Sequence, residues 1–198
     1  MEIGVSEERG SSMVEMLGVI SVMAILATGA WNLIGSARYR YRVSQGIMQL
    51  QSLQKGISRF YASAGNYNKL ADNDAIEVLF ENRIIPKEMK ASGNKIRNIF
   101  RNEVEIKNVS YENIEDYGKS SDSFTITFKA VEKKECMELA SIAWVQNDSA
   151  NLVSIQIGET KFVWPKYDSG EGNVLPVTTA KGMVSCADAP IDMSWEFR

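Results

Sequence analysis

The sequence predicts an α+β protein in which one long N-terminal helix packs on a head built around an antiparallel sheet. Three observations support this fold class. Residues 13–35 are almost all apolar, an apolar stripe at helical spacing continues to Phe60, and several later segments alternate apolar with polar residues. The expected domains are a leader peptide, a transmembrane half and an amphipathic half of the helix, and a globular head, at residues 1–10, 11–35, 36–64 and 65–198.

The first half of the helix is long enough to cross a bilayer. From Met13 to Gly35 the chain has 23 residues with Glu15 as the one ionisable side chain, and a helix of that length reaches ~34 Å. The run is longer than the apolar core of a signal peptide. We therefore expect the segment to remain in the mature protein.

The second half of the helix is predicted to be amphipathic. All four prolines lie after residue 85, so one helix is free to continue to a stop at Gly65 and Asn66. Such a rod would be ~78 Å long. The same spacings also fit the a and d positions of a coiled-coil stalk. The apolar stripe consists of Val43, Ile47, Leu50, Leu53, Ile57 and Phe60.

The head is predicted to combine strands with a shorter helix. Alternating, β-branched segments predict strands at 123–131, 151–157, 160–164 and 191–197. The segment from Lys133 to Gln146 predicts a helix, and the long N-terminal helix is expected to cover an apolar surface of the sheet. The apolar face of the shorter helix would contain Leu139, Ile142, Ala143 and Val145.

Composition argues against an enzyme and against a nucleic-acid-binding protein. The chain has no His, which removes the commonest general base and the commonest transition-metal ligand. The 22 Lys and Arg residues are balanced by 25 Asp and Glu residues, without a long basic run. We expect no catalytic residues, no cofactor and no resident metal.

Glu15 is the candidate assembly residue. A carboxylate inside an apolar span costs ~2.5 to 3.5 kcal/mol on insertion scales and normally has a partner. If the chain is cut after Gly10, Ser11 gains a free α-amine. A neighbouring copy shifted along the helix axis would present that amine to Glu15, so the carboxylate would be satisfied only in an assembly.

The residues around this carboxylate resemble the processing site of type IV prepilins and pseudopilins. The resemblance rests on Arg9-Gly10, then Ser11 to Glu15, then the apolar run. It implies that a prepilin peptidase cuts after Gly10 and N-methylates Ser11, and that Glu15 pairs with the amine of a neighbouring subunit. Ser11 and the acidic leader differ from the apolar first residue and basic leader usual in that family.

The head resembles that of type IVb pilins, the class of toxin-coregulated and conjugative thin-pilus subunits. The resemblance rests on Tyr67-Asn68-Lys69-Leu70, the stretch DAIEVLFENR, Ile85-Pro86 with Met89, and the region from Ile96 to Ile106. It implies the pilin fold and a disulfide between Cys136 and Cys186. Arg101-Asn102 occupies the place where many relatives have a glycine turn.

Two further segments carry candidate binding residues. The loop YDSGEGN contains Asp168, Glu171 and Asn173, a weak calcium candidate that lacks the full spacing of a known calcium motif, so a solvated turn is the favoured interpretation. Three arginines and two tyrosines alternate over residues 38–42, a pattern that fits an interface belt better than a site for DNA or anionic lipid. The positive-inside rule alone would place these arginines in the cytoplasm, whereas the processing motif places them outside.

The resemblance implies a structural subunit that is stored in the bacterial inner membrane and polymerised through its N-terminal helix into an extracellular pilus. The apolar stripe is expected to pack into the fibre core, and the head to mediate adhesion, aggregation or mating contact. Expected partners are other copies, the prepilin peptidase, the assembly machinery with its ATPase, the membrane, and a host or neighbouring cell surface. The alternatives are a single-span anchored coiled-coil binding or sensor protein, or a minor pilin or pseudopilin of a secretion system.

Overall fold

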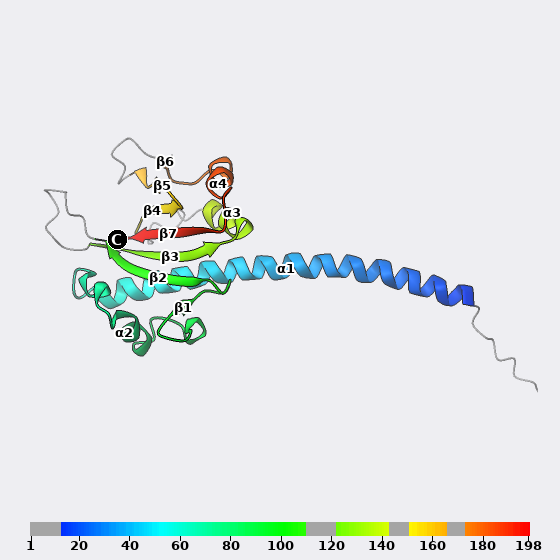
Figure 1. Ribbon diagram of the computed structural model, residues 1–198, viewed down its shortest axis with the longest axis horizontal. Coiled ribbons are helices and arrows are strands. Elements are labelled where there is room, and N and C mark those ends of the chain that lie inside the picture. The colour runs from blue at the N-terminus through cyan, green and yellow to red at the C-terminus, as the bar shows by residue number, and fades with distance from the viewer. Residues whose placement is uncertain (1–12, 110–121, 143–150, 166–172) are drawn as a thin grey trace, which may run out of the picture. The chain divides into compact units, whose positions relative to one another are not determined.

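The computed structural model describes residues 13–109, 122–142, 151–165 and 173–198, and within the N-terminal helix it leaves the side chains of residues 29–33 undescribed. The chain divides into two compact units, Met1–Tyr41 and Arg42–Arg198. The second unit contains the end of the long helix and the whole head (Figure 1). The predicted α+β class is confirmed.

The N-terminal helix α1 runs from Met13 to Tyr61, 49 residues without a break. It ends a few residues before the predicted stop because the N–H groups of Ala64 and Gly65 both donate to the Tyr61 carbonyl, and Gly65 adopts a positive φ of 66°. A glycine in the left-handed region is the usual way to close a helix. The shorter helical elements are η1 (Asn68–Ala71), α2 (Ala75–Glu81), η2 (Lys87–Met89), α3 (Lys133–Ser141) and α4 (Thr179–Ser185).

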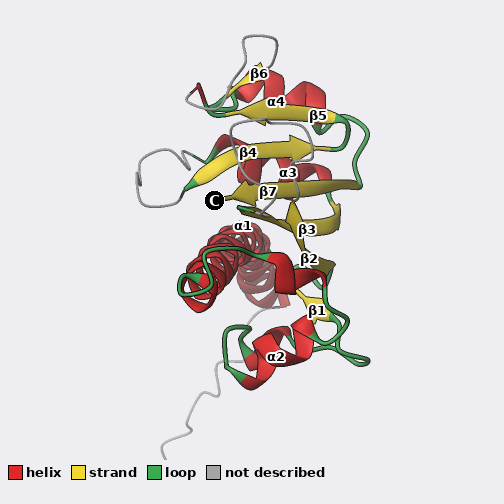
Figure 2. Ribbon diagram, turned by 90° about the vertical axis from the view of Figure 1, so that its left-hand side faces the viewer, coloured by secondary structure: helices red, strands yellow, loops and turns green. Residues whose placement is uncertain are grey.

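The head is organised by one seven-stranded sheet in the order β1-β2-β3-β7-β4-β5-β6. Neighbouring strands pair antiparallel, except β5 and β6, which are parallel. The last strand therefore lies in the middle of the sheet, between β3 and β4 (Figure 2). The strands are β1 (Ile96–Arg97), β2 (Glu103–Val109), β3 (Ser123–Val131), β4 (Leu152–Ile157), β5 (Thr160–Val163), β6 (Asn173–Val174) and β7 (Ile191–Phe197).

The register places apolar side chains together on one face. Trp195 of β7 is aligned with Ile126 of β3 and Ile155 of β4, and all three are fully buried. The alternate positions carry hydroxyl and charged groups, such as the pair Thr127 and Ser194. Because side chains alternate between the two faces of a strand, this pattern gives the sheet one apolar and one polar face.

The apolar stripe of α1 is buried in the head of its own chain. Within the second unit, α1 lies along β2 and β3 (Figures 1 and 2). Val43, Leu50, Leu53 and Ile57 are all buried. The prediction that this stripe packs into a fibre core is wrong, because these side chains already belong to the core of the head. Tyr61, not Phe60, completes the stripe, since four residues after Ile57 the helix returns to the same face.

Two glycines allow the loop between α2 and β2 to contact α1 closely. A Cβ at Gly46 would lie 2.7 Å from the Phe100 ring, and one at Gly56 would lie 2.8 Å from the Ile84 side chain. The Gln49 side-chain oxygen accepts a hydrogen bond from the Ile99 N–H at 2.9 Å. These contacts fix the C-terminal part of α1 to the head.

The predicted helix that begins at Lys133 is shorter than expected. It ends at Ser141, and Ile142 has extended backbone with φ −63° and ψ 132°. Leu139 is buried as predicted. Ile142 therefore does not extend the helical face, because its backbone is no longer helical. Ala143 and Val145 lie outside the described residues.

Candidate functional site

The candidate assembly site is the exposed first part of α1. Glu15 lies in the first turn of the helix, where a carboxylate is favoured by the partial positive charge of the helix N-terminus. Its side chain is exposed. The predicted processing residues Gly10 and Ser11 lie outside the described residues.

Apolar side chains around Glu15 point outward on every side of the helix. From residue 13 to residue 28 all side chains are exposed, including large apolar ones. A helix that is apolar all round is stable only when apolar surroundings cover it. The exposed apolar residues are Met13, Val14, Met16, Leu17, Val19, Ile20, Val22, Met23, Ile25 and Leu26.

No helix in the described part of the chain is both long enough and apolar enough to cross a membrane. The predicted transmembrane segment, residues 11–35, includes residues 11 and 12 and the side chains of 29–33, all outside the description. That segment stays a prediction.

The arginines that follow the apolar run lie on exposed helix positions. Arg38, Arg40 and Arg42 are all exposed. Arg42 also lies over the Phe100 ring, with its guanidinium carbon 5.5 Å from the ring centroid. A cation over an aromatic face is attracted by about 0.5–1 kcal/mol at an exposed site. Arg42 therefore helps hold α1 against the loop.

The structure contains the disulfide that the resemblance implies. Cys136 in the first turn of α3 is bonded to Cys186, the residue that caps α4, across 50 positions of sequence. Both residues are fully buried. A closed loop of that length stabilises the folded state by about 4 kcal/mol in the chain-entropy model. The bridge therefore holds the two helices of the C-terminal region together.

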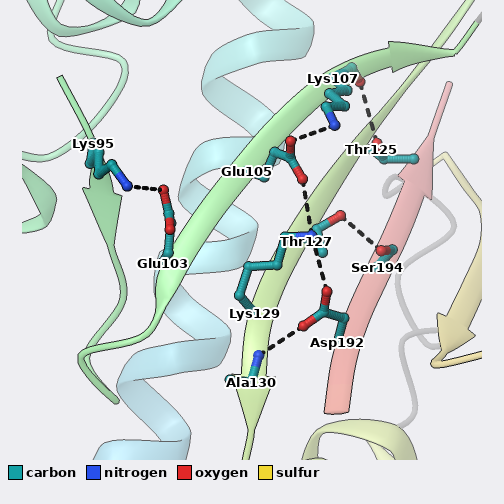
Figure 3. A network of polar contacts seen from close by, with 10 residues as sticks. All are labelled: Lys95, Glu103, Glu105, Lys107, Thr125, Thr127, Lys129, Ala130, Asp192 and Ser194. Atoms are coloured by element: carbon teal, nitrogen blue, oxygen red, sulfur yellow. Dashed lines mark hydrogen bonds and ion pairs between the residues drawn. The ribbon is translucent and has the colours of Figure 1, made fainter. Parts of the chain in front are cut away.

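Charged residues form a network on the polar face of the sheet (Figure 3). Lys129 of β3 contacts Glu105 of β2 at 3.2 Å and Asp192 of β7 at 3.0 Å. Hydrogen bonds from Lys107 and Lys129 lower the pKa of Glu105, and the contacts with Asp192 and Glu105 raise the pKa of Lys129. Each pair is partly exposed, so individual contributions are of the order of 0.2–1 kcal/mol.

A second polar group on the same face was not predicted from the sequence. Glu196 of β7 is buried, and Ser123 and Ser154 donate hydrogen bonds to its two carboxylate oxygens at 3.2 and 2.8 Å. Lys161 lies 3.1 Å from the same carboxylate, with nearly half of its side chain exposed. Burial raises the pKa of Glu196 to about 7 and lowers the pKa of Lys161. The alternation of residues in β7 predicts that Glu196 lies on the polar face of the sheet, but it does not predict that Glu196 is buried there.

The weak calcium candidate is only partly within the described residues. Asp168 and Glu171 lie outside them. Asn173 begins β6, and its side-chain oxygen accepts a hydrogen bond from the Lys181 ammonium at 3.1 Å, a contact that a cation would have to displace. Within the residues that the structure covers, no group of three or more metal-ligating His, Cys, Asp or Glu side chains occurs.

Comparison with known proteins gives a family and a fold. The family model described as PilS N terminal matches residues 40–191. The crystal structure of a type IV b pilin from Salmonella typhi superposes with a TM-score of 0.54 and 13% identity, covering 77% of this chain and 97% of that one. The pilin TcpA from Vibrio cholerae El Tor biotype gives a TM-score of 0.54 and 15% identity, covering 80% of this chain and 99% of that one.

No curated protein sequence matches the chain significantly. At these low identities the two solved structures show the fold alone, and that fold is the predicted one of a long helix with an antiparallel-sheet head. The family model covers most of the chain, including the end of α1 and nearly the whole head. The chain therefore belongs to the PilS N-terminal family and has the fold of type IVb pilins, which are structural proteins and not enzymes.

Proposed function

We propose that this chain is the precursor of a type IVb-like pilus subunit, cleaved after Gly10, N-methylated at Ser11 and polymerised through the first half of α1. The observation that carries the proposal is the helix segment from residue 13 to residue 28, which has apolar side chains on all sides and Glu15 as its single carboxylate. Copies of the same helix would cover that surface on every side in a fibre.

Glu15 has the role of setting the position of each subunit along the fibre. A carboxylate among apolar side chains is costly without a partner. The new α-amine at Ser11 of a neighbouring copy is the partner that cleavage creates. A copy in the wrong position along the axis leaves Glu15 unpaired, so the pairing selects one register.

The same surface explains storage before assembly. Residues 1–10 act as the leader, 11–35 span the inner membrane, 36–64 form the amphipathic part of the helix and 65–198 form the exported head. The peptidase and an assembly ATPase act on this form, and the finished fibre is extracellular. The head then provides the surface that contacts a host cell or a neighbouring cell.

The decisive experiment is intact mass and N-terminal sequencing of the protein from its membrane fraction and from sheared surface fibres. We expect a mature chain that begins at N-methyl Ser11. Glu15→Val should be processed normally but enter fibres at least about tenfold less. The variant lacks the ion pair between Glu15 and the α-amine of a neighbouring copy, and its loss removes more than ~1.4 kcal/mol of assembly free energy. Glu88→Val, a change of an exposed carboxylate in the head, is the matched control and should assemble like the wild type.

Retention of residues 1–10 would refute the proposal and favour an anchored coiled-coil binding or sensor protein. Equal amounts of wild type and Glu15→Val in fibres would refute the role of Glu15. A processed chain present only in traces in the fibre fraction would identify a minor pilin or a pseudopilin.

A further inference from the structure

Acidic and basic residues are separated along this chain. Residues 16–71 contain six bases and no acid, whereas residues 72–81 contain four acids and no base. The basic segment includes α1 after its apolar half, and the acidic segment includes α2. The bases are Arg38, Arg40, Arg42, Lys55, Arg59 and Lys69, and the acids are Asp72, Asp74, Glu77 and Glu81.

The part of α1 within the head unit has an unpartnered face opposite the buried stripe. Ser44, Met48, Ser52, Lys55 and Arg59 recur at spacings of three and four, and all are exposed. Neither Lys55 nor Arg59 makes an ion pair with any described residue. We call Lys55 and Arg59 the basic face.

The helix α2 has an acidic counterpart. Asp74, Glu77 and Glu81 follow one another at spacings of three and four, so they share one side of the helix, while Ala75 and Leu79 are buried. Across the described ranges these three carboxylates also form no ion pair. We call Asp74, Glu77 and Glu81 the acidic face.

The two faces match in spacing as well as in sign. Lys55 and Arg59 are four residues apart on a helix, as are Glu77 and Glu81. Both pairs of positions are therefore separated by about 6 Å along their helix axes. Two ion pairs can form together when the helices lie side by side. Within one copy, the described residues show no ion pair between the two faces.

We propose that the basic face of α1 binds the acidic face of α2 on a second copy of this chain. The inference rests on the proposed function, because polymerisation through α1 brings the basic segments of many copies together. The like charges of neighbouring basic segments repel one another. Carboxylates from another element are needed to offset that repulsion in a fibre of such helices. The two faces are different surfaces of the chain, so a pair of bound copies still has one unused basic face and one unused acidic face. Further copies can bind there, as in an open helical polymer.

The test is reciprocal charge reversal in the full chain, expressed with its assembly system and measured as subunit in sheared fibres relative to subunit in membranes. Lys55→Glu with Arg59→Glu, and separately Glu77→Lys with Glu81→Lys, should each reduce fibres at least about tenfold through like-charge contact. All four changes together should restore fibres to within about threefold of wild type. Lys133→Glu with Lys134→Glu, at exposed positions of α3, is the matched control and should have no effect.

The inference would be overturned if the two double variants assemble like the wild type, or if the quadruple variant assembles no better than the weaker double variant. Salt dependence gives a second measurement that does not require reversed charges. Dissociation of wild-type fibres should increase with NaCl, and Lys55→Gln with Arg59→Gln should make it less salt-sensitive. Equal salt sensitivity would also overturn the inference. Absence of wild-type fibres would overturn the proposed function and this contact with it, whereas wild-type fibres with unaffected variants would overturn the contact alone.

Discussion

The stability of the head should depend on the protonation of Glu196. Burial raises the pKa of this carboxyl from an ordinary value of 4.5 to about 7. The half-exposed Lys161 beside it offers a pairing energy of only about 0.2–1 kcal/mol. The burial penalty on the charged carboxylate therefore exceeds the attraction of its partner.

The direction of the pH effect follows from proton binding in the two states. Between about pH 4.5 and pH 7 the folded protein holds the Glu196 proton and the unfolded chain does not, so the free energy of unfolding falls as pH rises. Above about pH 7 both states are ionised and the dependence stops. The difference between the two pKa values corresponds to roughly 3 kcal/mol, which is roughly 6–12 °C in Tm for a chain of this size.

Glu196→Gln removes the titrating group and keeps one of the two oxygens that accept from Ser123 and Ser154, while its amide NH₂ faces the other serine as a donor. Thermal unfolding of the full chain in a mild non-ionic detergent, followed by circular dichroism from pH 4.5 to pH 8, measures the effect. The Tm of the variant relative to the wild type should rise across this range and then level off. Glu105→Gln is the control, because the lowered pKa of Glu105 changes stability only as pH falls below its ordinary value of 4.5, so its Tm difference from the wild type should stay constant across this range. A Tm difference between the wild type and Glu196→Gln that stays constant with pH would refute the reasoning.

Two further predictions concern backbone positions. Ala130 has a positive φ of 47° where β3 has one residue more than β7, so Ala130→Gly should relieve strain and raise the free energy of unfolding by up to about 1 kcal/mol in denaturant titration; a loss instead would contradict the strain. Gly158 has a φ of 57° and its Cβ would lie 2.5 Å from Ile191, so Gly158→Ala should cost about 2–4 kcal/mol by the same measurement. Gly93→Ala has similar strain with no neighbour within 4 Å and should cost only about 1–2 kcal/mol; equal losses at both glycines would exclude the contact with Ile191.

The elements with contiguous sequence signals were predictable. The alternating segments at 123–131 and 191–197 correspond to β3 and β7, with the same bounds. The apolar stripe predicted which face of α1 is buried, because helical periodicity is a local property of the sequence. The resemblance in addition implied the disulfide that joins α3 to α4.

The errors concern properties that depend on distant residues. The destination of the apolar stripe is the head of the same chain, and sequence spacing does not distinguish that core from contact with another copy. The length of α3 was overestimated because the apolar periodicity of the sequence continues past Ser141, whereas the backbone of Ile142 is already extended. The burial of Glu196 depends on β7 lying between β3 and β4, with β5 beside β4, and no local pattern contains that pairing.

The two parts of α1 have different requirements, and this difference bears on how the proposed fibre forms. After Arg42 one side of the helix is buried in the head, so the apolar side of that part is covered within one copy. The segment from residue 13 to residue 28 is apolar all round and needs cover from outside. Lipid tails and the helices of other copies are similarly apolar, so moving the segment between them changes little hydrophobic free energy. Polar terms must then select the fibre over the membrane, and Glu15 is the charged residue of that segment, whereas the Ser21 and Thr28 hydroxyls donate to carbonyls of their own helix.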